Sequence, residues 1–173
     1  MPITVHCGPM FAGKTEALLA AFRAARHPLA FKPAIDTRHA RDAIVTHTGD
    51  QIPATAVCTA GDLLSLIPEG TDTVCLDEAQ FFGPALLSVA RRLSDSGVHF
   101  VAACLDLDAQ RLPFGAVGDL LAIADTVVKH RAQCARCQSP APFTRRTARI
   151  DAQVFVGGAE SYAPMCLEHW RAP

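Results

Sequence analysis

The chain has 173 residues, of which 50% are hydrophobic, and a formal net charge of −1 at pH 7. That length supports one domain with its own core and a small additional module, and it excludes two full-sized domains. The near-zero charge gives no overall attraction to nucleic acid or to an anionic membrane, so a small-molecule partner is favoured over both.

Short apolar runs typical of buried strands alternate with helix-like segments as far as residue 130. The predicted strands are 3–7, 29–34, 43–47, 52–57, 71–79, 98–106 and 125–130. The predicted helices are 16–26, 61–70, 83–97 and 115–124. Strands separated by helix-length crossovers predict an α/β fold, in which a mainly parallel sheet has helices on both faces.

The character of the chain changes after about residue 133. The segment 133–173 is richer in Pro, Arg and Gly, and it loses the helical periodicity. We therefore expect a nucleotide-binding domain over 1–133 and a small second module, built around a metal, over 134–173.

Four cysteines lie in apolar runs, where a free thiol usually behaves as a small core residue: Cys7, Cys58, Cys75 and Cys104. No apolar run approaches the roughly 20 residues of a bilayer span, and residues 1–10 lack the basic start of a signal peptide. Together these features predict a non-secreted, cytoplasmic protein in a reducing compartment that has no membrane partner.

The octapeptide GPMFAGKT has the P-loop spacing G-x-x-x-x-G-K-T between a predicted strand and a predicted helix. Its glycines let backbone N–H groups turn toward phosphate oxygens, Lys14 can reach the β- and γ-phosphates, and the Thr15 hydroxyl can bind Mg²⁺. The context favours a nucleotide site over a fortuitous glycine turn. The predicted nucleotide-binding residues are Gly8, Pro9, Met10, Phe11, Ala12, Gly13, Lys14 and Thr15.

An acid pair, Asp77 and Glu78, follows the apolar run of the predicted strand 71–79. A strand ending in acids delivers a carboxylate to the magnesium of a P-loop, and a second acid can then face a nucleophile. The alternative is an ordinary acid pair at the start of the next helix. With the P-loop beside it, we predict the functional role.

The pairs Cys134-x-x-Cys137 and Cys166-x-x-His169 have the spacing of zinc ligands. Three thiolates and one imidazole suit tetrahedral Zn²⁺, and a filled ligand set makes the metal structural. A variant with His130 in place of His169 is a weaker alternative. The metal would pin both ends of segment 138–165, which can then act as a lid.

In this order, the motifs GPMFAGKT, FKPAIDTR, DEAQFF, LDLDAQRLPFG, ADTVVKHRAQCARC, FTRR, QVFVGGAESY and CLEH resemble type II thymidine kinases, the zinc-containing class with a lasso loop. The resemblance runs nearly the full chain. It implies transfer of the γ-phosphoryl group of ATP, with Mg²⁺, to the 5′-hydroxyl of thymidine or deoxyuridine. It also implies a homotetramer that dTTP inhibits.

The resemblance also implies residue roles. Glu78 would be the general base, and the magnesium and phosphoryl side would hold Thr15, Asp36, Arg38 and Asp77; without the family, Asp36 and Arg38 would read as a surface ion pair. A lasso from about residue 138 to 164 would close over the nucleoside. The implied substrate-binding residues are Phe114, Phe143, Thr144, Val154, Val156, Gly157, Gly158 and Tyr162.

Two positions depart from the family pattern. Ala12 stands where the family usually has serine, which we expect to matter little because backbone amides dominate P-loop binding. Ala109 stands where the family commonly has phenylalanine near the nucleoside, so it opens space there or leaves that wall to another residue. The alternative function is that of a P-loop ATPase whose zinc module binds nucleic acid or protein rather than a nucleoside.

Overall fold

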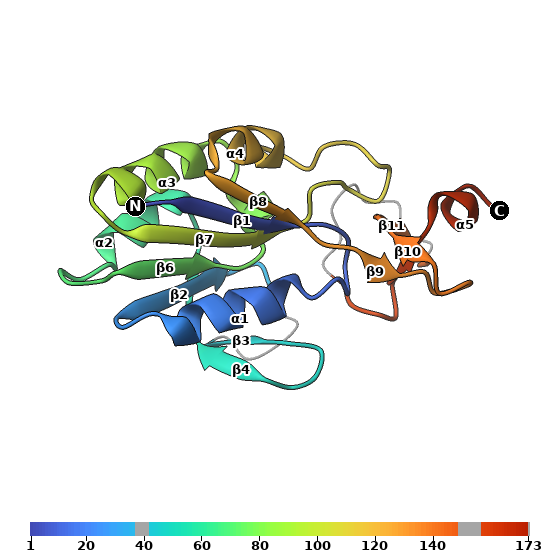
Figure 1. Ribbon diagram of the computed structural model, residues 1–173, viewed down its shortest axis with the longest axis horizontal. Helices are drawn as coiled ribbons and strands as arrows, with labels where there is room; N and C mark the ends of the chain where they lie inside the picture. Colours follow the sequence, from blue (N-terminus) through green and yellow to red (C-terminus); the bar gives the residue numbers. More distant parts are fainter. Residues whose placement is uncertain (37–41, 149–156, 173) are drawn as a thin grey trace.

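The computed structural model describes residues 1–36, 42–148 and 157–172. Its centre is a sheet of six strands in the order β5-β2-β6-β7-β1-β8, all paired in parallel (Figure 1). The predicted α/β class is therefore confirmed. The strands are β1 (Ile3–Cys7), β2 (Pro28–Pro33), β5 (Thr55–Val57), β6 (Thr73–Leu76), β7 (His99–Cys104) and β8 (Thr126–Lys129).

Helices cover both faces of this sheet, with α1 (Lys14–Ala24) on one face and α2 (Ala60–Ser65), α3 (Ala85–Asp95) and α4 (Val117–Ile123) on the other (Figure 1). Successive strand residues alternate between the two cores. Val74 and Phe100 pack toward α2, α3 and α4, whereas Cys75 and Val101 pack toward α1. Burial on both faces explains why the strands read as continuous apolar runs.

A small hairpin extends the core on the α1 side. Strands β3 (Ala43–Val45) and β4 (Gln51–Pro53) pair antiparallel, and Ile44 and Ile52 pack in the same cluster as the buried leucines of α1. The hairpin places Thr46 and His47 in a cavity that Thr15 and Asp77 also line.

A separate small core supports the C-terminal module, which lies beyond the carboxyl ends of the sheet strands (Figure 1). Its centre is formed by Ala132, Cys134, Ala141 and Met165. The elements are β9 (Ala132–Gln133), β10 (Pro140–Ala141), β11 (Phe143–Arg146), β12 (Tyr162–Met165) and α5 (Leu167–Arg171). Strand β9 precedes the predicted boundary at residue 134 and pairs with β10 beyond it; the boundary itself stays a prediction.

Three structural features differ from the sequence expectations. Helix α5 and the 3₁₀ helix η1 (Ala79–Phe82) were not predicted, because five and four residues are too few to show helical periodicity. Cys58 is exposed rather than in the core, since it follows β5 at the edge of the sheet, whereas Cys7, Cys75 and Cys104 are buried. Among the described residues, no helix is both long and apolar enough to cross a membrane.

Candidate active site and metal cluster

The predicted phosphate loop connects β1 to α1 and has the backbone geometry that its glycines allow. Gly8 has φ +137°, and Gly13, at the start of α1, has φ +81°. A Cβ on Gly8 would lie 2.5 Å from the carbonyl oxygen of His130, whose own N–H donates to the carbonyl oxygen of Cys7 at 2.7 Å. The loop therefore packs directly on the backbone after β8, with no room for a side chain at Gly8.

Gly8→Ala is accordingly expected to distort the loop. A forced left-handed conformation together with a backbone overlap should cost about 2–4 kcal/mol of unfolding free energy. It should also weaken nucleotide binding by at least about tenfold, to be measured by titration calorimetry beside denaturant unfolding.

The matched control is Gly118→Ala in α4, where a Cβ meets nothing within 4 Å. There the added methyl group should raise stability by about 0.5–1 kcal/mol, since alanine is the better helix former. Equal behaviour of the two variants would contradict the tight packing of Gly8.

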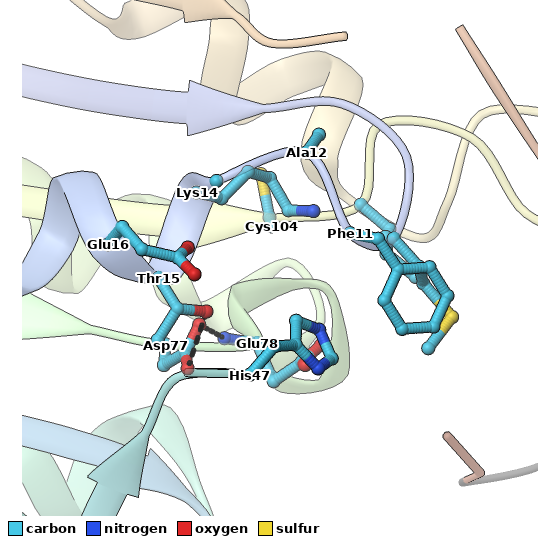
Figure 2. A pocket seen from close by; sticks show the side chains of 12 residues that line it. Phe11, Ala12, Lys14, Thr15, Glu16, His47, Asp77, Glu78 and Cys104 are labelled. Atoms are coloured by element: carbon cyan, nitrogen blue, oxygen red, sulfur yellow. Dashed lines mark hydrogen bonds between the residues drawn. The ribbon is translucent and has the colours of Figure 1, made fainter. Parts of the chain in front are cut away.

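The acid pair lies beside the phosphate loop, at the carboxyl end of β6 (Figure 2). The Thr15 hydroxyl donates to one carboxylate oxygen of Asp77 at 3.5 Å, and the other oxygen accepts the N–H of Glu78 at 3.0 Å. Glu78 has φ +52°, an uncommon value for a residue with a side chain. A strained backbone conformation persists only where surrounding contacts hold it, and such conformations are frequent at functional sites.

Lys14 opens α1 and lines one cavity together with these acids. Its Nζ donates to the carbonyl oxygen of Pro9 at 2.5 Å. Burial lowers the pKa of Lys14, and the negative charges of Glu78 and Asp77 partly offset that shift. The loop therefore holds a partly buried ammonium group in a cavity that the two carboxylates also line, where it can meet a bound phosphate.

Three side chains at this site were not predicted. Gln80, which is buried, donates through Nε2 to Glu78 at 2.5 Å and accepts the N–H of Leu105, after β7, at 3.1 Å. His47, from the β3–β4 hairpin, packs against Phe11 with ring centroids 4.6 Å apart and ring planes tilted by 40° (Figure 2). Lys32 on β2 is only 2% exposed.

Two adjoining cavities meet at the acid pair. One is lined by the phosphate loop with Cys104 and Leu105, and the other by Lys32, Asp36 and residues 43–46. The residues that line both are Thr15, His47, Asp77 and Glu78. The structure thus places Asp36 in the same site as Thr15 and Asp77, while Arg38 lies outside the described residues.

Some of the predicted nucleoside-binding residues lie on the C-terminal module near the phosphate loop. Phe143 and Thr144 belong to β11, and the Thr144 hydroxyl oxygen accepts the N–H of Met10 at 3.0 Å. Gly158 accepts the N–H of Tyr162, which opens β12, at 3.1 Å. The neighbouring Gly157 is buried.

The other predicted nucleoside-binding residues are Phe114, Val154 and Val156. Phe114 packs edge-on against Phe81 of η1, with ring centroids 5.8 Å apart. Val154 and Val156 lie outside the described residues, and their predicted contacts remain predictions.

The four predicted metal ligands come together, with all ligand atoms within 4.8 Å of one another: Cys134, Cys137, Cys166 and His169. The Sγ atoms of Cys137 and Cys166 are 3.8 Å apart, and Cys134 Sγ lies 3.6 Å from His169 Nδ1. Tetrahedral Zn²⁺ with Zn–S bonds of about 2.3 Å separates its ligand atoms by about 3.6–3.8 Å. The cluster can hold a metal ion such as zinc.

The local backbone favours this arrangement. Burial opposes ionisation of Cys134, but the N–H groups of Cys166, Arg136 and Cys137 outweigh it and lower the pKa of the Cys134 thiol to about 6. A thiol that ionises readily is a ready metal ligand. Helix α5 begins after Cys166, which brings His169 back over it, 3.2 Å from Sγ to Nδ1.

We expect purified protein to contain about one zinc per chain by elemental analysis. Cys166→Ser should lose most of that zinc and lower the unfolding free energy by about 4 kcal/mol, because a structural metal is lost. Cys58→Ser, an exposed cysteine outside the cluster, is the control and should change neither quantity. Full zinc content in Cys166→Ser would contradict the ligand assignment.

Comparisons with known proteins agree with this geometry. The family model described as thymidine kinase matches residues 1–170. The chain belongs to the thymidine kinase family. Curated thymidine kinases from Bacteroides thetaiotaomicron and from two strains of Bacteroides fragilis are each 40% identical to it over 170 residues, covering 96% of this chain and 85% of each relative. The resemblance in the motifs is thereby confirmed, and a P-loop ATPase with a nucleic-acid-binding or protein-binding zinc module is not favoured.

Proposed function

We propose that the protein transfers the γ-phosphoryl group of ATP to the 5′-hydroxyl of thymidine, and of deoxyuridine, to give the 5′-monophosphate and ADP. The observation that carries this proposal is that Lys14 and Thr15 of the phosphate loop line one cavity with Asp77 and Glu78. A phosphate cradle and a carboxylate pair in one cavity suit phosphoryl transfer to a hydroxyl group. Membership of the thymidine kinase family indicates which hydroxyl compound is bound.

The chain's own residues account for nucleotide binding. N–H groups of residues 11–13 and the positive end of α1 bind the phosphate oxygens, and the Lys14 ammonium group offsets the charge that develops on the γ-phosphoryl group. Thr15 and Asp77 offer a hydroxyl and a carboxylate oxygen 3.5 Å apart, the oxygen ligands that Mg²⁺ prefers, and Asp36 lines the adjoining cavity. Bound there, Mg²⁺ would neutralise phosphate charge.

Glu78 is the group proposed to take the proton. Its carboxylate accepts the 5′-hydroxyl proton while the oxygen bonds to the γ-phosphorus and the bond to the bridging β–γ oxygen breaks, releasing ADP. The amide nitrogen of Gln80 donates to the Glu78 carboxylate, and its amide oxygen accepts the N–H of Leu105, directly after β7. The Glu78 carboxylate is thus oriented by a side chain that is itself fixed to the backbone. Arg38 is proposed to act on the same phosphoryl group.

The nucleoside is proposed to lie between the loop after β7 and the lasso. Apolar walls would come from Phe114, Phe143, Tyr162, Val154 and Val156, with polar and backbone groups from Thr144, Gly157 and Gly158. A closed site that pairs its backbone groups with the thymine edge leaves them unpaired with cytosine, at about 1–3 kcal/mol for each buried group. The 5-methyl contact is worth only about 1 kcal/mol, so deoxyuridine stays a substrate.

The deciding experiment is a turnover assay of purified protein with ATP, Mg²⁺ and a panel of nucleosides. Thymidine should be used at least as well as deoxyuridine, with deoxycytidine and purine deoxynucleosides far below. Ala109→Phe, in the tip of the loop after β7, should change tolerance of 5-substituted analogues more than it changes the KM for ATP. Deoxycytidine turned over as well as thymidine would refute the proposed readout.

We further propose a homotetramer that dTTP inhibits and that resides in the cytoplasm. The family resemblance supports the first two, and seven free cysteines fit a reducing compartment. Light scattering gives the subunit number, and inhibition by dTTP that competes with thymidine tests the feedback. Disulfide formation in the isolated protein would weaken the compartment assignment.

A further inference from the structure

A tight loop after β7 presents Arg111 to the C-terminal module. One carboxylate oxygen of Asp108 accepts the N–H groups of both Gln110 and Leu112 at 2.9 Å. Arg111 donates its own N–H to the carbonyl oxygen of Asp108 at 3.0 Å and has φ +68°. A left-handed conformation is unfavourable for arginine, so a contact of its side chain must offset the strain.

That contact is a stack of the guanidinium group on two aromatic rings. The Arg111 Cζ lies 4.3 Å from the ring centroid of Phe143 and 5.0 Å from that of Trp170. The two rings meet edge to face at 6.4 Å. Within the described residues, Arg111 Nε and Trp170 Nε1 are buried without a hydrogen-bond partner. The contact between Arg111 and the two rings is therefore stabilised by cation–π attraction rather than by hydrogen bonds from these two nitrogen atoms.

The two rings belong to a module that has its own connections. Phe143 begins β11 and Trp170 lies in α5. Arg145, also in β11, donates to the carbonyl oxygen of His169 in α5 at 3.1 Å, and His169 belongs to the metal cluster. The module is thus held together without Arg111, which reaches it from the other part of the chain.

The stack includes one predicted wall of the nucleoside site and lies close in sequence to another. Phe143 precedes Thr144, which is bonded to Met10 of the phosphate loop. Phe114 lies three residues after Arg111 in the same loop. A contact that joins the loop to Phe143 therefore sets how far apart Phe114 and Phe143 lie.

We propose that Arg111 is a positioning residue that docks the C-terminal module on the loop after β7 and so fixes the width of the nucleoside site. This inference rests on the proposed function. It assigns Arg111 no contact with substrate and no part in the proton transfer. Its loss should loosen the nucleoside side of the site and leave the phosphate loop unchanged.

The test compares Arg111→Met, which keeps length but removes charge and planarity, with the wild type and with Arg91→Met on the exposed side of α3. The KM for thymidine should rise about tenfold in Arg111→Met, while the KM for ATP and the zinc content stay within about twofold. Arg91→Met should match the wild type. A thymidine KM within twofold of the wild type, or an equal rise in both KM values, would overturn the proposal.

Fluorescence gives a readout that needs no substrate. Trp170 is the single tryptophan of the chain, so the emission of ligand-free protein reports on the stack alone. Arg111→Met should change its intensity or wavelength, and an unchanged spectrum would overturn the contact. A wild-type enzyme inactive on thymidine would instead defeat the proposed function while leaving this measurement valid.

A second variant, Arg111→Lys, keeps the proposal testable if Arg111→Met does not fold. Arg111→Lys keeps the charge but loses the flat guanidinium group, so the thymidine KM should rise by about threefold and the emission should change. Wild-type values of both in Arg111→Lys would contradict stacking as the means of docking.

Discussion

Lys14→Ala is expected to lower kcat/KM for thymidine phosphorylation by on the order of 10²–10³-fold, because it removes a preorganised charge at the phosphoryl group. The ammonium group lies within the phosphate loop and lines the same cavity as the acid pair, and burial already lowers its pKa. Charge aimed at the developing phosphoryl charge in such a desolvated place acts more strongly than in water. Steady-state kinetics with ATP and thymidine give the value.

The control for this variant is Arg91→Ala, which removes a cationic side chain from the exposed face of α3. It should keep wild-type turnover. Circular dichroism checks that Lys14→Ala protein is folded. Zinc content checks separately that the C-terminal module, which holds the metal cluster, is intact. Wild-type turnover in folded Lys14→Ala protein would contradict the assignment of residues 8–15 as the phosphate-binding loop.

Glu78→Gln is expected to lower kcat by on the order of 10²–10⁴-fold while thymidine affinity changes by less than about threefold. The amide keeps the shape of the side chain but cannot take the proton from the 5′-hydroxyl. Rapid-quench kinetics give the chemical step, and calorimetry gives the affinity. Glu69→Gln, an exposed glutamate, is the matched control.

Two results would count against this role of Glu78. An unchanged rate would mean that another group takes the proton. A large loss of thymidine affinity with an unchanged chemical step would instead make Glu78 a binding residue.

The parts of the site that could be predicted are those carried by contiguous motifs. The phosphate loop is one octapeptide between a strand and a helix, and the acid pair follows a buried strand directly. The cysteines and His169 are two pairs with ligand spacing, and the two pairs need only one turn each. Their chemistry depends on local geometry, which the sequence determines.

The residues that escaped prediction depend on neighbours distant in the chain. Lys32 reaches the acid pair because β2 pairs with β6, and His47 reaches it because a hairpin folds beside α1. Nothing in the sequence around either position says which strands are adjacent. Gln80 is different: it stands two residues after Glu78 in DEAQFF, and a polar side chain so close to a candidate base was a usable signal.

The docking contact of Arg111 shows the same limit. The sequence places it in a polar loop, where an arginine is most often solvated. Its partners lie 32 and 59 residues further along the chain, and only the folded module brings Phe143 and Trp170 together. A left-handed arginine can be recognised only in a three-dimensional structure.

The place of β1 within the sheet has a consequence for synthesis on the ribosome. β1 lies between β7 and β8, which pair with it through residues 100–104 and 126–129. At about 5–20 residues per second, roughly 6–24 s separate the synthesis of β1 from that of β8. Both edges of the nascent β1 are unpaired until β7 is synthesised, and until β8 follows one edge stays unpaired and Gly8 lacks the His130 backbone on which it packs. The phosphate loop is among the first segments to be translated and among the last to acquire its packing, so a nucleotide bound there would stabilise the chain only after β8 is complete.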